Sequence, residues 1–432
     1  MRKARSVEAV HAMRFSIFTT GCKANQWDSH VIADRLKERG LTQGSIQAAD
    51  IIIINACSLT GRAEADARRF IARARQMNGH ARIALVGCHA QVYEARHFGA
   101  DLILGQAEKF DAERYVAGPG CFVAKKRNLP MEGLPADGVQ KGRTRSFFKI
   151  QDGCDKFCSY CIVPFARGAV RSRPIAQIAA FLEVLRKKGT REVVLTGIDL
   201  AAYADPASGK GLKELLLALE NLDTPARIRL SSIDPEYIDA DFVRILSASR
   251  KIARSIHIPA QSGCDAVLEA MGRRYRSALV RQVVDRLVAG NGTIGIGMDI
   301  MTGFPGEDEE RFRQTYEFIE SLPIYYLHVF PFSEREGTRA CAMGGKVADH
   351  TKRERVRKLK KLDAEKRAAF SRRFIGERLW VIPEGRVYKD GYVKGFSDNY
   401  LPVHLPYEKT LENNLVEVTI EGMEGPRLIG GY

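Results

Sequence analysis

The sequence lacks any hydrophobic run long enough to cross a membrane. None of its apolar stretches approaches the roughly 18 residues that a transmembrane helix requires. The first residues, MRKARSVEAVHAM, carry positive charge but lack the apolar core of a secretory signal. We therefore expect a cytoplasmic protein without a membrane partner, in which residues 1–12 form a loose extension.

The sequence also lacks the cysteine pattern of a disulfide-bonded protein. Its nine cysteines are an odd number in a chain without an export signal, so metal binding or catalysis is the better explanation for them. The 432 residues are 45% hydrophobic and 28% charged, as in ordinary globular proteins, and predict about three domains.

Acidic residues are in the minority. Against 52 Asp and Glu stand 67 Lys and Arg, which gives a net charge of +15. A basic protein gathers near polyanions, because its cations neutralise phosphates. This balance favours a nucleic-acid partner without saying which one, and plain solubility is the alternative explanation.

Strand-like and helical segments alternate over most of the chain. In residues 14–117 the short apolar runs FSIFTT, IIIIN and RIALVG are each followed by a polar helical stretch, which predicts a doubly wound parallel α/β domain. Residues 118–142 are rich in Gly and Pro and predict a linker. The region 143–373 contains six further βα units and predicts an incomplete (β/α)6 barrel. Its expected strands are FFKI, EVVLT, RIRLSS, SIHIP, GIGMDIM and YYLHVF.

The last part of the chain changes character. Residues 351–373 form a long basic amphipathic segment, whose charged face is either simply solvated or faces RNA. Residues 374–432 alternate Gly, Val, Tyr and Leu with turn residues, which predicts a small antiparallel β-barrel.

Three cysteines lie close together after the first strand of the predicted barrel. Cys154, Cys158 and Cys161 follow FFKI, at the end of the barrel where such enzymes place their chemistry. Thiolates hold iron–sulfur clusters, and three of them leave one iron of a four-iron cluster open to a small molecule. A zinc knuckle would need a fourth ligand, and neither Cys nor His follows at finger spacing. Three unrelated thiols are the other alternative.

A second set of cysteines is spread along the sequence but occupies equivalent positions. Cys22, Cys57 and Cys88 each lie just beyond a predicted parallel strand, where doubly wound sheets form their ligand crevice. We therefore expect the three thiols to converge on a second iron–sulfur cluster. Three buried structural cysteines are one alternative. A nucleophilic cysteine beside His89 is another.

The spacing of the compact triplet resembles that of the radical-SAM superfamily. That resemblance implies that the open iron binds S-adenosylmethionine, with the cofactor supplying the radical chemistry. It also implies that Tyr160, Gly197, Ser231 and Gln261 line the S-adenosylmethionine pocket. Here Gly197 is followed by Ile-Asp instead of Gly-Glu, so the individual contacts stay open.

The segments TTGCKANQWDS, NACSLT and GCHAQ, followed by the radical-SAM triplet, resemble the methylthiotransferase family over residues 14–432. The resemblance implies three domains: an N-terminal methylthiotransferase domain, a radical-SAM core and a C-terminal TRAM domain. The segment GYVKGFSDNYLPVHL resembles the TRAM signature. The family resemblance also implies two [4Fe-4S] clusters. One S-adenosylmethionine would methylate a sulfur atom at the cluster of Cys22, Cys57 and Cys88. A second would be cleaved at the cluster of Cys154, Cys158 and Cys161, giving the radical that removes hydrogen from an unactivated substrate carbon.

Substrate choice within the family depends on weaker signals. FKIQDGCDKFCSYCIVPFARG and LHVFPFSEREGTRA most resemble the branch that modifies carbon 2 of threonylcarbamoyl-adenosine, 3′ of the anticodon of tRNA. Isopentenyl-adenosine tRNA and a ribosomal-protein aspartate are the alternative substrates. The expected partners are a tRNA anticodon stem-loop and a reductant such as flavodoxin or ferredoxin, and we expect a monomer. A non-catalytic RNA-binding iron–sulfur sensor is the competing hypothesis of another class.

Overall fold

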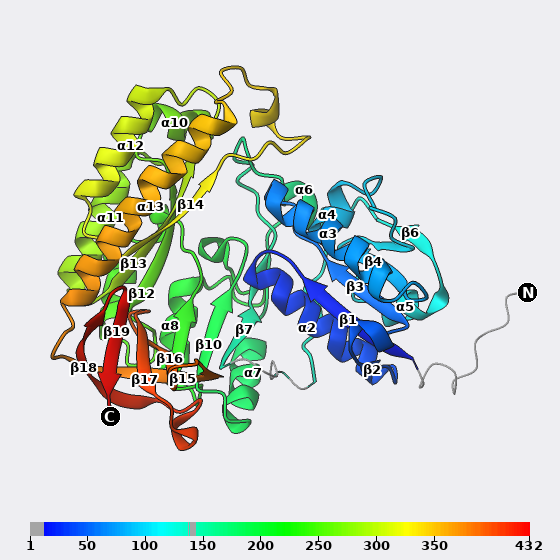
Figure 1. The fold of residues 1–432 in the computed structure, drawn as a ribbon, viewed down its shortest axis with the longest axis horizontal. Coiled ribbons are helices and arrows are strands. Elements are labelled where there is room, and N and C mark those ends of the chain that lie inside the picture. Colours follow the sequence, from blue (N-terminus) through cyan, green and yellow to red (C-terminus); the bar gives the residue numbers. More distant parts are fainter. Residues whose placement is uncertain (1–12, 137, 139–143) are drawn as a thin grey trace, which may run out of the picture. The chain divides into compact units, whose positions relative to one another are not determined.

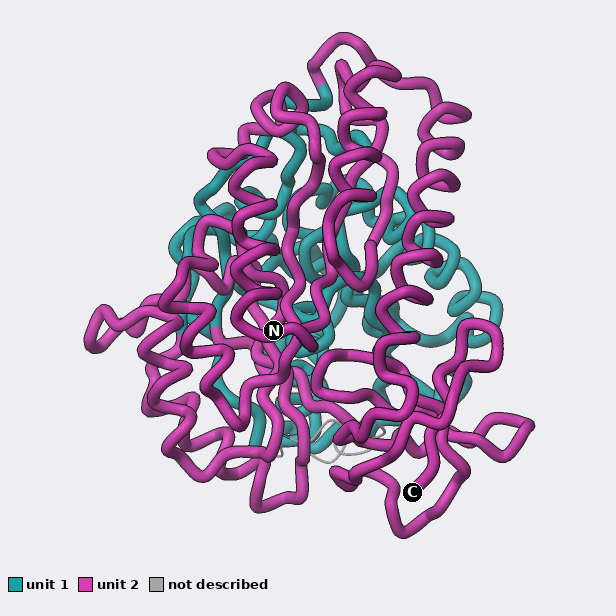
Figure 2. Tube along the Cα trace, turned by 90° about the vertical axis from the view of Figure 1, so that its left-hand side faces the viewer, with its two compact units in different colours: residues 1–138, 151–172, 333–341 teal, residues 139–150, 173–332, 342–432 magenta. Residues whose placement is uncertain are grey.

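The computed structural model describes residues 13–136, 138 and 144–432. The expected N-terminal extension (1–12) and part of the expected linker lie outside these residues. The chain divides into two compact units, shown in different colours in Figure 2. The first comprises residues 1–138, 151–172 and 333–341, and the second comprises residues 139–150, 173–332 and 342–432.

The first unit contains a parallel six-stranded sheet (Figure 1). Its order is β2-β1-β3-β4-β5-β6, so the strand order reverses direction beside β1. The four isoleucines that open β3 are all fully buried, as expected for a parallel strand covered on both faces. The strands are β1 (Arg14–Thr19), β2 (Thr42–Gln43), β3 (Ile51–Asn55), β4 (Arg82–Val86), β5 (Leu102–Leu104) and β6 (Gly120–Phe122).

Helices cover the two faces of this sheet. Helix α2 (Lys23–Glu38) packs Ile32 and Leu36 on one face, together with α5 (Ala112–Ala117). Helix α3 (Gly61–Met77) packs Ala67 and Ile71 on the other. The short helix α4 (Cys88–Val92) follows β4 directly. The predicted doubly wound α/β arrangement is confirmed.

The first unit also includes a segment from the middle of the chain. Strands β8 (Gln151–Asp152) and β9 (Arg171–Ser172) pair in antiparallel fashion. Between them lie the compact cysteine triplet and helix α6 (Val163–Arg167). The chain leaves the second unit at residue 150 and returns to it at residue 173.

The second unit contains six parallel strands in two sheets, ordered β11-β10-β7 and β12-β13-β14. One parallel bridge, between Ile228 and Ile252, links the two sheets, so the strands follow each other in chain order. The predicted incomplete (β/α)6 barrel is therefore confirmed. The strands are β7 (Arg145–Lys149), β10 (Glu192–Thr196), β11 (Arg227–Leu230), β12 (Ser255–Gln261), β13 (Gly295–Thr302) and β14 (Tyr326–Pro331). The intervening helices are α7 (Ile175–Lys187), α8 (Leu212–Glu220), α9 (Ala240–Ala248), α10 (Asp265–Ala270), α11 (Ser277–Gly290) and α12 (Glu309–Ser321).

A long helix and a small closed barrel complete the second unit. Helix α13 (Asp349–Arg372) buries Leu359, Leu362 and Phe370, and Phe370 also belongs to the core of the small barrel. The barrel closes in the order β15-β16-β17-β19-β18, with antiparallel pairs except for β17 beside β19. Its strands are β15 (Arg378–Val387), β16 (Tyr392–Ser397), β17 (Pro402–Pro406), β18 (Val416–Glu424) and β19 (Arg427–Gly431).

A buried charge network joins the small barrel to the larger one. Glu192 at the start of β10 accepts hydrogen bonds from Arg227 and Arg229 of β11. Arg227 also donates to the carbonyl of Phe396, and Arg229 donates to the carbonyl of Ser397. Because both guanidinium groups are nearly fully buried, their carboxylate and carbonyl partners are required to satisfy them.

Within the described part of the chain, no helix has both the length and the apolar character that spanning a membrane requires.

Candidate functional site

Cys22, Cys57 and Cys88 lie at one edge of the sheet of the first unit. They follow β1, β3 and β4, which are neighbouring parallel strands. Cys57 and Cys88 are buried and Cys22 is half-buried. The carboxyl ends beside β1, where the strand order reverses, are where ligands bind in sheets of this kind.

The backbone before two of these cysteines is unusually close to its neighbours. Gly21 has a φ of 92°, and a Cβ atom there would lie 2.4 Å from Cβ of Cys57. Gly87 has a φ of 93°, and a Cβ atom there would lie 2.2 Å from Oδ1 of Asn55. Only glycine tolerates both the left-handed conformation and the approach. The turns therefore bring the cysteine-bearing loops together.

Hydrogen-bond donors and cations surround the buried sulfur atoms. The backbone N–H of Leu59 donates to Sγ of Cys57 at 3.4 Å, and Nε2 of Gln106 donates to Sγ of Cys88 at 3.4 Å. Burial raises the pKa of Cys88, while the cations Arg167 and Lys109 oppose that rise. Such donors stabilise thiolates that ligate iron–sulfur clusters, so the residues present fit a cluster.

The geometry does not support a nucleophilic cysteine here. Burial, with contributions from Cys22 and Cys88, raises the pKa of the Cys57 thiol to about 12, so an unligated thiol would stay protonated at neutral pH. Nε2 of His89 lies 2.9 Å from the carbonyl oxygen of Arg96, so this nitrogen bonds to the backbone and does not accept a thiol proton. A nucleophilic cysteine beside His89 is therefore not favoured.

The compact triplet lies in a loop of the same unit. Cys154, Cys158 and Cys161 are all half-buried. The N–H of Cys154 donates to the carbonyl of Gly168 at 3.2 Å, and the N–H of Cys161 donates to the carbonyl of Cys158 at 3.0 Å. The carbonyl of Ser159 accepts a hydrogen bond from the N–H of Ala340 at 2.8 Å. The loop is thus held by backbone bonds while its three cysteines are only half-buried.

Arg167 connects the segments that carry the two triplets. Its guanidinium lies 2.9 Å from a carboxylate oxygen of Asp28 on α2 and 2.9 Å from one of Asp152, two residues before Cys154. It also donates to Oδ1 of Asn25 on α2. All three partners are buried, and the side chain of Arg167 is 1% exposed. This network fixes α2 against the loop of the compact triplet.

The residues expected to line a S-adenosylmethionine pocket divide between the units. Tyr160 is half-buried in the cysteine loop of the first unit. Gly197, Ser231 and Gln261 follow or end β10, β11 and β12 of the second unit. Among the described residues, Oγ of Ser231, Oε1 of Gln261 and Oγ1 of Thr302 are buried without a hydrogen-bond partner. Buried polar atoms of this kind, at the ends of adjacent strands, fit the recognition of a polar ligand.

Sequence reasoning did not identify the polar side chains behind the cysteines. Asn25 and Asp28 lie three residues apart on α2, within the segment that follows Cys22, and this spacing places them on one helix face. Arg167 lies six residues after Cys161. Lys109, which lies 2.6 Å from Asp28, and Gln106 had no local signal, because only the fold brings them to the sulfur atoms.

Comparisons with known proteins identify the class. Residues 148–319 match the radical SAM superfamily, and residues 14–105 match a family described as uncharacterized protein family UPF0004. A solved structure of the radical S-adenosylmethionine methyltransferase TsrM from Kitasatospora setae superposes with a TM-score of 0.55 and 16% identity, covering 76% of this chain and 77% of that chain. This likeness shows the fold. The superfamily implies a [4Fe-4S] cluster and S-adenosylmethionine.

Relatives along the whole chain identify the family. A protein from Aquifex aeolicus named threonylcarbamoyladenosine tRNA methylthiotransferase MtaB is 34% identical over 90% of this chain and 98% of its own length. A protein of the same name from Thermotoga maritima is 34% identical over 95% of both chains. This chain therefore belongs to the radical-SAM methylthiotransferase family and is an enzyme.

Proposed function

We propose that this enzyme inserts a methylthio group at carbon 2 of threonylcarbamoyl-adenosine, 3′ of the anticodon of tRNA. The single observation that carries the proposal is the presence of both cysteine triplets in one compact unit, joined through Arg167. The names of the relatives from Aquifex aeolicus and Thermotoga maritima support the choice of nucleoside. The unpaired base 3′ of an anticodon can be turned out of its loop into an enzyme pocket.

We assign two [4Fe-4S] clusters to the two triplets. Cys154, Cys158 and Cys161 would hold the cluster that binds S-adenosylmethionine, and Cys22, Cys57 and Cys88 would hold the second. When bound, the clusters supply the electron for cleavage of one S-adenosylmethionine and a position for the sulfur that a second methylates. Each triplet leaves one iron without a cysteine ligand, as both roles require.

The protein's own side chains position and shield this chemistry. Arg167 and Asp28 hold the two cysteine-bearing segments at a fixed separation, because each is buried and satisfied by the other. Gln106 and the N–H of Leu59 stabilise negative charge on the buried sulfurs. Ser231 and Gln261 offer unpaired polar atoms to S-adenosylmethionine.

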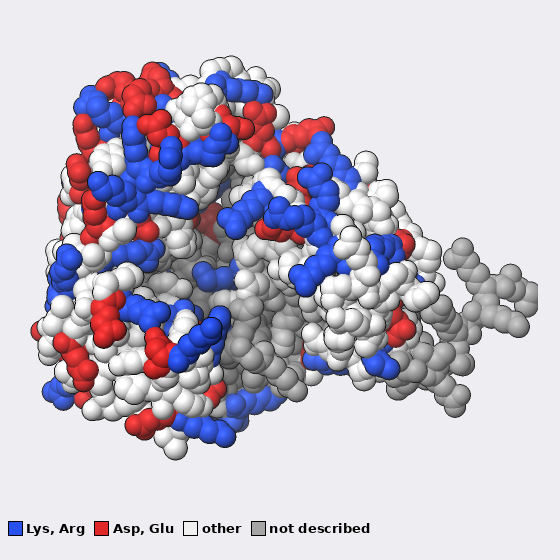
Figure 3. Space-filling model, viewed as in Figure 1, with Lys and Arg blue, Asp and Glu red and all other residues white. Residues whose placement is uncertain are grey.

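The exposed side of α13 supports a tRNA partner. Figure 3 shows Lys and Arg side chains gathered on the face where Figure 1 places this helix. Arg353, Arg357 and Lys360 are spaced so that they share one side of the helix, and all three are exposed. They form no ion pair with the described residues, whereas Lys358 pairs with Glu354. Unpaired cations in a row suit the phosphates of a nucleic acid.

The small barrel is a second element suited to RNA. Its five strands form a closed sheet, an architecture used by small oligonucleotide-binding barrels. We assign it to the TRAM fold on the resemblance of GYVKGFSDNYLPVHL. The domain limits 14–117, 143–373 and 374–432, a cytoplasmic location, a monomeric state and a reductant such as flavodoxin or ferredoxin belong to the same proposal.

Mass spectrometry of tRNA nucleosides tests the substrate. We expect a strain lacking the gene to lose 2-methylthio-threonylcarbamoyl-adenosine and to regain it when the gene is returned. Loss of methylthiolated isopentenyl-adenosine instead, or of a methylthiolated aspartate in a ribosomal protein, would assign one of the alternative substrates. Unchanged 2-methylthio-threonylcarbamoyl-adenosine in the deletion strain would contradict the proposal.

Iron and sulfide analysis tests the cofactors independently. Anaerobically prepared protein should contain about eight irons and about eight sulfides per chain, because each cluster contributes about four of each. About four irons would leave only one cluster and would contradict the assignment of Cys22, Cys57 and Cys88.

A further inference from the structure

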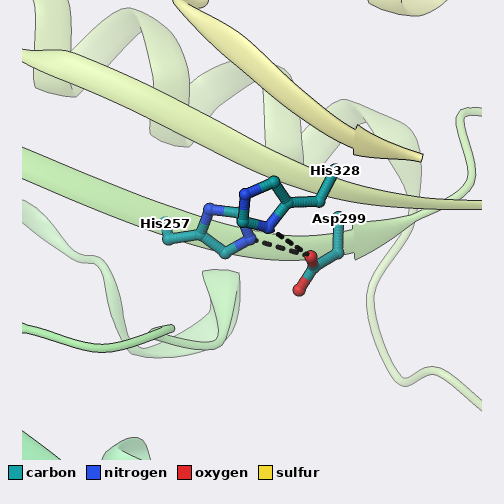
Figure 4. A group of neighbouring side chains, drawn as sticks. All are labelled: His257, Asp299 and His328. Atoms are coloured by element: carbon teal, nitrogen blue, oxygen red, sulfur yellow. Dashed lines mark ion pairs between the residues drawn. The ribbon is translucent and has the colours of Figure 1, made fainter. Parts of the chain in front are cut away.

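Three side chains on neighbouring strands of the larger barrel converge at one point (Figure 4). They are His257 on β12, Asp299 on β13 and His328 on β14. Nε2 of His257 lies 2.9 Å from Oδ1 of Asp299, and Nδ1 of His328 lies 3.4 Å from the same oxygen. One donor atom from each of the three residues lies within 4.8 Å of the other two.

His257 and Asp299 form a close ion-pair contact whose geometry is poor for a hydrogen bond. Nε2 of His257 is buried, and among the described residues it has no partner in hydrogen-bond geometry, although Oδ1 of Asp299 is close. An N–H on this nitrogen does not point at the oxygen. A nitrogen lone pair and a carboxylate oxygen held this close repel each other unless the imidazole is protonated or a metal ion lies between them.

The other nitrogen of His257 is oriented by a tyrosine. Nδ1 lies 3.1 Å from the hydroxyl oxygen of Tyr326, which can accept a hydrogen bond from Nδ1–H. In that tautomer the lone pair of Nε2 is available to a metal ion. Metal-binding histidines characteristically make such a bond with their second nitrogen. The tyrosine ring reaches His257 across β13 because residue 297 is glycine. A Cβ atom there would lie 2.1 Å from Cζ of Tyr326.

We propose that His257, Asp299 and His328 form a binding site for a divalent transition metal ion such as zinc. When two ligand atoms each lie about 2.1 Å from a metal ion and the ligand–metal–ligand angle is between a right angle and the tetrahedral angle, the two atoms are about 3.0 to 3.4 Å apart. The two distances from Oδ1 of Asp299 match this range. Two imidazoles and one carboxylate are a donor set for zinc or iron(II). Three rigid, hydrogen-bonded strands place these donors in advance.

The site has room for an additional ligand. Three protein ligands leave at least one coordination position of a tetrahedral or larger shell open. The side chain of His328 is 60% exposed, so one side of the site faces solvent. None of the three residues belongs to the cysteine triplets, and the site is independent of the proposed substrate.

Zinc binding to the cluster-loaded enzyme tests the site. The enzyme, with its iron and sulfide content verified, is cleared of loose metal with a chelator, given zinc anaerobically and freed of excess. We expect about one zinc per chain by elemental analysis, with X-ray absorption showing nitrogen and oxygen neighbours at about 2.0–2.1 Å and no sulfur at about 2.3 Å.

Three variants and a matched control make the result specific. His328→Ala removes an exposed ligand, so it should fold normally and lose the bound zinc, and Asp299→Asn should do the same. Tyr326→Phe should weaken zinc binding by about 10- to 100-fold, the usual effect of losing an orienting partner. His350→Ala removes another exposed histidine of the same unit and should retain all the zinc. Sulfur neighbours around zinc, no bound zinc, or full binding by His328→Ala would each overturn the proposal.

Discussion

Arg167 and Asp28 form a buried ion pair, with Nη2 of the arginine 2.9 Å from Oδ2 of the aspartate. Their side chains are 1% and 0% exposed. The two residues are 139 positions apart in the sequence, and each belongs to a segment that carries one of the cysteine triplets. The pair therefore holds these two segments together from behind the cysteines.

Arg167→Ala should destabilise the enzyme severely. It leaves the buried carboxylates of Asp28 and Asp152 with Lys109 and Arg171 as counter-charges. Breaking a buried pair costs about 3–5 kcal/mol when no other cation remains, so we expect a loss of up to that size. Anaerobic denaturant unfolding would measure the change. Arg69→Ala is the control, because its ion pair with Asp66 is exposed and should contribute less than about 1 kcal/mol. Equal losses in the two variants would contradict the role of the buried network.

Substitutions in the two cysteine triplets should abolish different activities. Cys158→Ala should abolish the formation of 5′-deoxyadenosine from S-adenosylmethionine under reducing conditions. Cys57→Ala should retain that cleavage but yield no methylthiolated tRNA. Cys121→Ala, which changes an exposed cysteine on β6, should behave as the wild type. Full methylthiolation by the Cys57 variant would show that the second cluster is wrongly assigned.

Gly21→Ala should damage the site of Cys22, Cys57 and Cys88. The new Cβ atom would lie 2.4 Å from Cβ of Cys57 in a backbone conformation that side chains rarely adopt. Iron content should fall from about eight to about four per chain, while cleavage of S-adenosylmethionine persists.

Gly99→Ala provides the matched control for that change. Gly99 also has a positive φ, 79°, but a Cβ atom there meets no other atom within 4 Å. It tests backbone strain without a collision. If both variants lost iron equally, the close approach of Gly21 to Cys57 would not be the cause.

Neutralising the exposed row on α13 should weaken tRNA binding. We expect Arg353→Ala, Arg357→Ala and Lys360→Ala combined to reduce affinity and to lower the salt dependence of binding by about one unit of slope for each lost phosphate contact. Filter binding across a salt series would measure both. Arg313→Ala is the control, since its guanidinium already pairs with Glu310 and Glu317. An unchanged salt dependence in the triple variant would exclude this row from the tRNA interface.

The stability of the second unit should decrease in acid because of Glu192. Burial alone would raise the pKa of this carboxyl group, but Arg229 and Arg227 outweigh it and hold the pKa below its ordinary value. Its contribution is therefore complete above the unfolded pKa of about 4.3 and disappears as pH falls through the lower folded value. Unfolding free energies measured between about pH 6 and pH 3 should fall for the wild type.

Glu192→Gln tests whether this carboxylate is responsible. The variant should be less stable at neutral pH, because two buried guanidinium groups lose their counter-charge. Its stability should then depend less on pH in the acid range. A variant with the same acid dependence as the wild type would assign the loss to other carboxylates.

Most of the fold could be predicted from the sequence, because its parallel strands are short runs of apolar, often β-branched residues. IIIIN and EVVLT are such runs, and both are fully buried strands. Strands β2, β5 and β6 were missed, since two or three residues give too little periodicity. Strand β6 extends the sheet from within the segment expected to be a linker.

The cysteines stand out in the sequence, whereas their surroundings do not. Cys22, Cys57 and Cys88 follow recognisable strands, so their common edge could be inferred. Lys109 and Arg167 are ordinary surface-type residues in sequence, and only the tertiary fold shows that they are buried beside sulfur. His257, Asp299 and His328 did leave a signal, because each is a polar residue inside an otherwise apolar strand, SIHIP, GIGMDIM or YYLHVF.

The first unit is assembled from three stretches of chain, the last of which ends at residue 341. During synthesis on the ribosome, this unit cannot be complete until more than three quarters of the polypeptide has been made. Contacts so distant along the chain form slowly. We therefore expect iron to be delivered to the finished polypeptide, and a fragment truncated after residue 138 to be a poor substitute for the metal-binding unit.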